Sequence, residues 1–445
     1  MIQPDTTQGS NKNKDMKEDT VPPLAGRHIF TGVKILAHHS DIVRHLIWID
    51  HYRLASAGDD CVVVVWDVQM GVKLKVLVQH NLPITCMMII HPEPDITDSL
   101  LLVTGSSDKQ LCVWNVDTGR CMQVIKDHHS PVKCLLEIPQ PKLFCSGGDQ
   151  KLCLWNQHGS LLYEHNMDCN EADIHSMLLL NDDWIVAATG DKLMVYGVLR
   201  GSDDIPECRI KRLKRLTATE HRDSIHCIIH VSEHTFASGS IDGSIVLWCS
   251  KTLAPFRFFM QPFSHNVVGN EGEKHDFPLS IQHMIAFQHV QQRFLLTTLG
   301  NGFCIYDVET GKMLAENKQA HNSKILYVCL VKNNSVLATC SEDGRLMLWG
   351  CIREQADVLD DNIFNRLLGT SQVDFPKSCD SKRVLKLKHI GECKGHSGAI
   401  QMCVNNGNNG LISCGSDGLV MAWSNAAQDA MSLNRLIQGI VFGTR

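Results

Sequence analysis

A four-residue pattern recurs along this chain and constrains its fold more than any other feature. In the stretch His321–Trp349, the His is followed by Thr339, by Asp343 in a tight turn, and by the Trp six residues later. The same order returns in five other stretches, and five of the six His-to-Trp distances are 27 or 28 residues. The complete sets are His39, Ser56, Asp60 and Trp66; His80, Thr104, Asp108 and Trp114; His128, Asp149 and Trp155, with Cys145 in the hydroxyl position; His221, Ser238, Asp242 and Trp248; His321, Thr339, Asp343 and Trp349; and His396, Ser413, Asp417 and Trp423.

Repeats of this length predict an all-β ring of blades. A period of roughly 40–50 residues, with short strands and a Trp-Asp-like ending, is typical of WD40 β-propellers, which this chain resembles. Two further stretches keep the strand pattern but carry Tyr196 and Tyr306 in place of the Trp. We therefore expect an eight-bladed propeller in which blades four and six are degenerate. The segment Val33–Leu36 is expected to supply the outer strand of the last blade and to close the ring.

These boundaries divide the chain into three parts. Residues 1–31 are polar and are predicted to form a disordered tail. Residues 32–424 are predicted to form the propeller, and residues 425–445 a C-terminal amphipathic helix. Composition is that of a globular protein, with 44% hydrophobic and 20% charged residues. A net charge of −6 does not indicate nucleic-acid binding. The odd number of cysteines, 19, without a Cys-x-x-Cys motif, indicates a reducing compartment. No apolar run reaches the ~20 residues of a membrane helix, so any membrane association is expected to go through a partner.

The recurrent His, Asp and hydroxyl residues have the composition of a catalytic triad. A triad occurs once in an enzyme, whereas this set returns in blade after blade. We therefore interpret the four side chains as a buried hydrogen-bond chain that holds each blade together. No catalytic residue, cofactor or nucleotide loop is predicted.

Two weaker patterns leave alternatives open. His226 and His230 on one strand face suggest either a metal pair or two solvated side chains. The basic run Arg209–Arg215 falls where the outer strand of blade four is expected. Its cations either guard a strand edge against aggregation or form a phosphate-binding stripe.

Three segments interrupt the array, and a regular ring needs none of them. Pro255–Leu279 is expected to be an irregular link before blade six. Residues 351–383 form an insertion between the last two strands of blade seven, and its apolar cluster Asp361–Leu368 suggests either a docking peptide or a packed flap. In the C-terminal segment, apolar residues recur at helical spacing, and the helix would pack on the ring or dock on a partner.

Some runs are more specific than generic repeat motifs. His38-His39-Ser-Asp-Ile-Val-Arg44 and Ala57-Gly-Asp-Asp-Cys-Val-Val-Val-Val-Trp66 resemble the WD repeat-containing protein 41 family, as does the plan of eight blades with a long blade-seven insertion. The resemblance implies a non-enzymatic scaffold, cytoplasmic and recruited to the lysosomal surface through partners. It implies a complex with two DENN-domain proteins, acting in amino-acid signalling, autophagy and small-GTPase control.

The resemblance also implies two contact regions. The chain ends would meet a DENN-domain partner through Val33, Ile35, Leu36, Met431, Leu433, Leu436, Ile437 and Ile440. The blade-seven insertion would engage a lysosomal cationic amino-acid transporter through Ile363, Phe364, Asn365, Arg366, Leu367 and Leu368. No metal, cofactor or nucleic acid is implied.

Two rival functions belong to the same fold. Substrate receptors of cullin ubiquitin ligases often end a blade in Trp-Asp-x-Arg. Here Trp66-Asp67-Val68-Gln69 lacks the Arg and Trp114 is followed by Asn115, which argues against that function. A generic peptide-binding scaffold is the other alternative.

Overall fold

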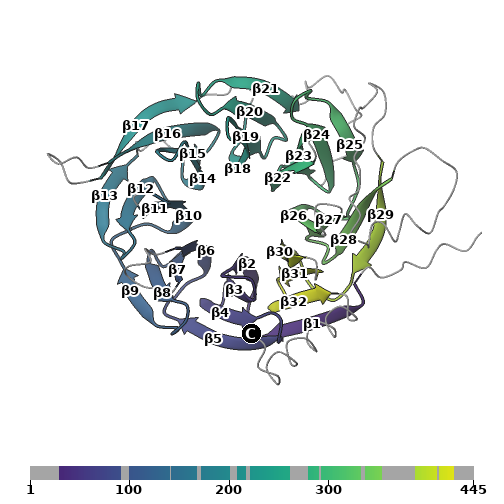
Figure 1. Cartoon of the computed structure of the whole chain (residues 1–445), viewed down its shortest axis with the longest axis horizontal. Helices are drawn as coiled ribbons and strands as arrows, with labels where there is room; N and C mark the ends of the chain where they lie inside the picture. Colours follow the sequence, from purple (N-terminus) through teal and green to yellow (C-terminus); the bar gives the residue numbers. More distant parts are fainter. Residues whose placement is uncertain are drawn as a thin grey trace, which may run out of the picture.

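The computed structural model describes residues 30–91, 100–140, 142–167, 172–200, 208–216, 221–260, 279–289, 292–331, 336–352, 386–407 and 410–424. Every regular element in these ranges is a β-strand, and no α-helix occurs among them. The strands form eight four-stranded antiparallel sheets arranged as a closed ring (Figure 1). The predicted eight-bladed propeller is therefore confirmed, degenerate blades four and six included.

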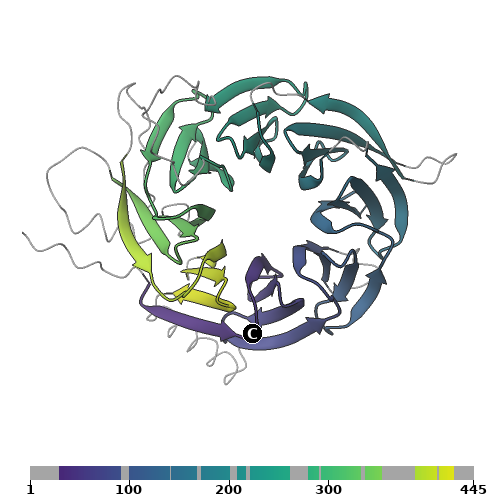
Figure 2. The ribbon, with the colours of Figure 1, turned by 180° about the vertical axis from the view of Figure 1, so that it is seen from behind.

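Blades one to seven are meanders whose first strand lies at the centre of the ring and whose last lies on the rim, and in blade eight the rim strand is β1 (Figures 1 and 2). The strands are, blade by blade, β2 (Val43–Trp48), β3 (Arg53–Gly58), β4 (Val62–Asp67) and β5 (Val72–Val78); β6 (Ile84–Ile90), β7 (Leu101–Ser106), β8 (Leu111–Asn115) and β9 (Cys121–Ile125); β10 (Val132–Ile138), β11 (Leu143–Gly148), β12 (Lys151–Asn156) and β13 (Leu161–Asn166); β14 (Ile174–Leu180), β15 (Trp184–Thr189), β16 (Lys192–Leu199) and β17 (Arg209–Leu216); β18 (Ile225–Ser232), β19 (Thr235–Ser240), β20 (Ile245–Cys249) and β21 (Pro255–Met260); β22 (Met284–His289), β23 (Gln292–Leu299), β24 (Gly302–Asp307) and β25 (Met313–Asn317); β26 (Ile325–Val331), β27 (Val336–Ser341), β28 (Leu346–Ile352) and β29 (Lys386–Cys393); and β30 (Ile400–Asn405), β31 (Gly410–Gly415) and β32 (Leu419–Ser424), completed by β1 (Gly32–Ala37).

The ring is closed by the two ends of the propeller. Strand β1 pairs with β32 in register from Gly32 opposite Ser424 to Ala37 opposite Leu419. The backbone N–H of Thr31 also donates to the carbonyl of Ser424 at 3.0 Å. The N-terminal strand was predicted from the missing outer strand of the last blade, and this prediction is confirmed.

The core lies between adjacent blades rather than in one centre. The two middle strands of a blade are covered on both faces, so β4 reads as a continuous Val-Val-Val-Val-Trp run and not as an alternating one. Trp155 and Trp248 are buried completely between neighbouring sheets. In the degenerate blades, Tyr196 and Tyr306 fill the same position and are also buried.

One expectation about a connecting segment is wrong. The aromatic run at 255–260 is the outer strand of blade five, β21, and not the start of an irregular link. Strand β17 does carry the basic run on the outer edge of blade four. Strand β28 runs to Ile352 and β29 begins at Lys386, so the segment between them starts and ends two residues later than the predicted insertion and has the same length. It lies between the last two strands of blade seven.

Candidate partner interface

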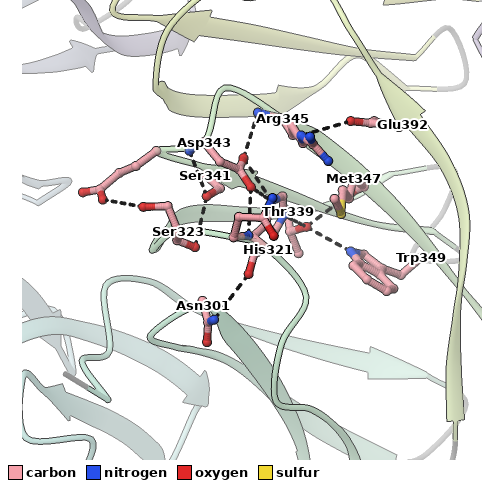
Figure 3. A network of polar contacts seen from close by, with 12 residues as sticks. Asn301, His321, Ser323, Thr339, Ser341, Asp343, Arg345, Met347, Trp349 and Glu392 are labelled. Atoms are coloured by element: carbon pink, nitrogen blue, oxygen red, sulfur yellow. Dashed lines mark hydrogen bonds and ion pairs between the residues drawn. The ribbon is translucent and has the colours of Figure 1, made fainter. Parts of the chain in front are cut away.

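The repeated polar side chains meet inside the blades. In blade seven, His321 Nε2 lies 2.7 Å from the Thr339 hydroxyl, and the Trp349 indole N–H donates to the same hydroxyl at 2.9 Å. His321 Nδ1 lies 3.1 Å from the Asp343 carboxylate (Figure 3). This carboxylate also accepts from the backbone N–H of Arg345 in its own turn and from that of Asn322 in the loop that enters the blade. The chain of bonds thus runs from the indole of strand β28 to the loop that enters the blade.

Blades one, two and eight repeat this geometry. The hydroxyl-to-imidazole distance is 2.8 Å in all three, the indole-to-hydroxyl distance is 2.7–3.0 Å, and the imidazole-to-carboxylate distance is 2.7–3.0 Å. In blade five, the imidazole of His221 binds the hydroxyls of Ser238 and Ser244, and Ser244 donates to Asp242. Ser244 is a relay that the repeat pattern did not reveal.

Blade three departs from the predicted set. The indole of Trp155 donates to the hydroxyl of Ser146 at 2.7 Å, so the hydroxyl position is Ser146 and the assignment to Cys145 is wrong. Asp149 forms an ion pair with Lys133, and His128 Nδ1 donates to the carbonyl of Ser130. The hairpin between β11 and β12 pairs Gly148 with Lys151 and is one residue shorter than its counterpart in blade one. This deletion shifts the Asp away from the imidazole.

These side chains cannot act as a triad. The hydroxyls of Ser56, Thr104 and Thr339 are completely buried and already accept an indole N–H. Burial lowers the pKa of His321 below 6.5 against the opposing attraction of Asp343, and the pKa of His80 is lowered in the same way. The arrangement is therefore a structural clamp, complete in blades one, two, five, seven and eight.

The closing strand β1 presents an exposed apolar surface. Val33 and Ile35 are 48% and 58% exposed. Both lie on the face of the last blade that is turned toward blade seven, since their cross-strand partners Trp423 and Met421 belong to the core shared with that blade. Leu36 points the other way and is buried against blade one, so it offers no surface to a partner.

A small pocket lies beside this surface. It has a volume of about 180 Å³ and is lined among others by Phe30, Val33, Leu348, Cys393, Lys394 and Trp423. It therefore lies at the seam where blade seven meets the closing strand. Phe30 was placed in the tail by sequence, yet it is buried against the core here; only its proximity in sequence to β1 could have suggested this.

The other predicted contact residues cannot be placed. Met431, Leu433, Leu436, Ile437 and Ile440, together with the whole C-terminal segment, lie outside the described residues. The same holds for Ile363, Phe364, Asn365, Arg366, Leu367 and Leu368 of the insertion. What the structure describes is where the chain leaves the ring, at Ile352 and Ser424, and where it returns, at Lys386.

The two strand histidines do not gather a metal site. His226 and His230 are four residues apart on β18, or about 13 Å along the strand. The ring of His226 instead stacks on His175 of blade four, with centroids 6.3 Å apart. Among the described residues, no group of three or more potential ligands could hold a metal ion, and no helix is long and apolar enough to cross a membrane.

Comparison with known proteins places the chain in a family. A family model described as WDR41, a β-propeller, matches residues 20–432. WD repeat-containing protein 41 of Mus musculus is 28% identical over 92% of this chain and 90% of its own length, and that of Homo sapiens is 29% identical over 90% and 88%. The crystal structure of the computationally designed Ika8 protein superposes with a TM-score of 0.59 at 18% identity, covering 88% of this chain and 98% of that one, which supports the fold alone. The chain therefore belongs to the WDR41 family of non-catalytic WD40 β-propellers.

Proposed function

We propose that this propeller is the adaptor subunit of a DENN-domain protein complex and helps to recruit that complex to lysosomes. The processes would be autophagy, amino-acid sensing and small-GTPase regulation. Family membership supports a non-catalytic scaffold. The particular partners follow from the resemblance noted in the sequence.

The observation that carries the proposal is the seam beside the closing strand. Val33 and Ile35 leave apolar side chains in solvent there, next to a pocket that contains Phe30 and Trp423. Both ends of the described propeller meet at this place, since Thr31 is bonded to Ser424. A partner that binds the chain ends would cover these side chains, and exposed apolar groups of this kind typically mark protein interfaces.

The first experiment tests this surface. The double variant V33K/I35K places two charges on exposed positions, so the ring should keep its melting temperature. We expect co-purification with DENN-domain proteins from cells to fall at least about tenfold, because two buried charges would oppose association. The matched control is M122K/L161K, which changes exposed apolar residues on the outer strands of blades two and three.

The control should retain the DENN-domain proteins at the wild-type level. Unchanged co-purification of the V33K/I35K variant would remove the seam as the contact. Mass spectrometry of the co-purified proteins also separates the rivals. Recovery of cullin adaptors would indicate a ubiquitin-ligase receptor. Recovery of neither DENN-domain proteins nor cullin adaptors would indicate a generic peptide-binding scaffold.

The second experiment concerns the lysosomal transporter. We propose that residues 363–368 of the blade-seven insertion bind it. Deletion of residues 355–380 leaves Ile352 and Lys386 in place, and these two residues pair directly across β28 and β29. The ring should therefore still form, while recruitment to lysosomes under amino-acid starvation is lost. Unchanged recruitment would contradict the role of the insertion.

A further inference from the structure

The outer strand of blade four is the most basic element of the propeller. Strand β17 carries Arg209, Lys211, Arg212, Lys214 and Arg215 within eight residues and contains no acidic residue. The chain as a whole has a net charge of −6. Within the described part of the chain, Lys211, Lys214 and Arg215 are exposed and form no ion pair. This cationic charge is therefore open to solvent and is not used to hold the blade.

The cations lie on the rim and are directed to both sides of the strand. Lys211 and Lys214 pair with Gly197 and Val195, and Val195 belongs to the core shared with blade five. Arg215 pairs with Met194, which packs toward blade three. Because cross-strand partners share a sheet face, the charge spreads around the outer edge of blade four and is not confined to one groove.

Apolar side chains accompany the charge. Leu213 is 45% exposed and lies over Gly197, where a bulge interrupts the pairing of β17 with β16. On β21, the neighbouring outer strand along the rim (Figures 1 and 2), Phe256 is 49% exposed and Phe258 is also exposed. Cations interleaved with Leu and Phe are the combination found on surfaces that rest in the headgroup region of a bilayer.

We propose that the rim formed by β17 and β21 binds peripherally to an anionic lipid surface, with Lys211, Lys214 and Arg215 at the headgroups. An acidic peptide added to the edge of β17 fits less well. The bulge at Leu213 breaks the regular row of backbone donors that an added strand needs, and a lysine-rich edge opposes such addition. The rim lies across the ring from the seam of blades seven and eight, so this contact does not depend on the proposed complex (Figure 1).

The test is vesicle flotation with the full chain. Vesicles of phosphatidylcholine with about one third phosphatidylserine should bind the protein, and pure phosphatidylcholine vesicles should not, because the attraction requires a negative surface potential. Raising the salt concentration from about 0.1 M to about 0.5 M should weaken binding. Since each cation near such a surface contributes about fivefold, K211Q/K214Q/R215Q should lose about a hundredfold in affinity, and K211E/K214E/R215E, which also adds repulsion, should lose more.

The matched control is K75E/K126E/K312E, which changes net charge equally at exposed lysines of blades one, two and six. It should bind within about twofold of wild type, because its cations are dispersed. Thermal melts check that all variants are folded. Three results would each overturn the proposal. They are binding to neutral vesicles as strong as binding to anionic ones, undiminished binding by K211E/K214E/R215E, and absence of vesicle binding. Binding to soluble polyglutamate without binding to vesicles would overturn it in favour of an acidic protein partner.

Discussion

At the scale of single residues, the same four residue types have different consequences in different blades. Asp343 accepts hydrogen bonds from buried His321 and from two backbone N–H groups. Asp149 stands at the same offset in the sequence but forms only a partly exposed ion pair with Lys133. The difference arises because the hairpin between β11 and β12 has one residue fewer. A search for residues at a fixed offset from the Trp still counts Asp149 as part of the motif.

This contrast predicts different stabilities for two Asp-to-Ala variants. Asp343→Ala leaves the buried Nδ1 of His321 without its partner and should lower the free energy of unfolding by about 1–3 kcal/mol. Asp149→Ala loses a solvent-screened pair and should cost about 1 kcal/mol or less. Urea denaturation of both variants is the measurement. Equal losses would contradict the assignment of Asp343 to a structural clamp.

A second residue-scale prediction concerns acid stability. His283 stacks on Tyr327 with ring centroids 3.8 Å apart, and burial lowers its pKa from 6.5 to about 4. The unfolded chain therefore binds a proton at higher pH than the folded chain does. The stability from the neutral imidazole is complete above pH 6.5 and is lost as the pH falls through 6.5 toward 4.

We expect wild type to lose about 2 kcal/mol through this group between about pH 7.5 and pH 4.5. The variant His283→Gln removes the titration while retaining a polar side chain. Its free energy of unfolding should fall less steeply over the same interval, although it is lower at pH 7.5. Parallel pH profiles for the two proteins would rule out His283 as a source of acid sensitivity.

At the scale of elements, the sequence predicted the buried strands and the closing strand, but it missed one outer strand. The number of blades, the two degenerate units and the closing strand followed from buried apolar runs and from the Trp or Tyr that ends them. The outer strand β21 was mistaken for an irregular link, because an outer strand is exposed and needs no regular apolar pattern. The pocket at the seam joins Phe30 to Trp423; the pairing of β1 with the last blade was predicted, but the burial of Phe30 just before that strand was not.

The closing strand provides an element-scale prediction, because its side chains face opposite environments. Leu36 is 1% exposed within the core between the last blade and blade one, whereas Ile35 is largely in solvent. Leu36→Ala should lower the free energy of unfolding by roughly 2–5 kcal/mol, as for other buried leucines. Ile35→Ala should change it by about 0.5 kcal/mol or less. Similar losses in urea denaturation would mean that β1 does not pack as described.

At the scale of the whole molecule, closure makes the first and last strands of the propeller depend on each other. Strand β32 has β31 on one side and β1 on the other, so loss of β1 exposes a full edge of six residues, Leu419–Ser424. An exposed edge is a template for pairing with another chain. The ring should therefore behave as one cooperative unit that opens at a single place.

Deletion of residues 1–37 tests this dependence, with deletion of residues 1–29 as its control. The longer deletion removes β1 and uncovers the core around Val420, so the protein should melt at lower temperature and self-associate through β32. The control keeps Phe30, Thr31 and β1, and should melt close to the full chain. A synthetic peptide spanning residues 30–38 should restore a monomer in size-exclusion chromatography, because it can pair with β32 in the native register. If both deletions melt together and remain monomeric, then β1 does not close the ring in solution.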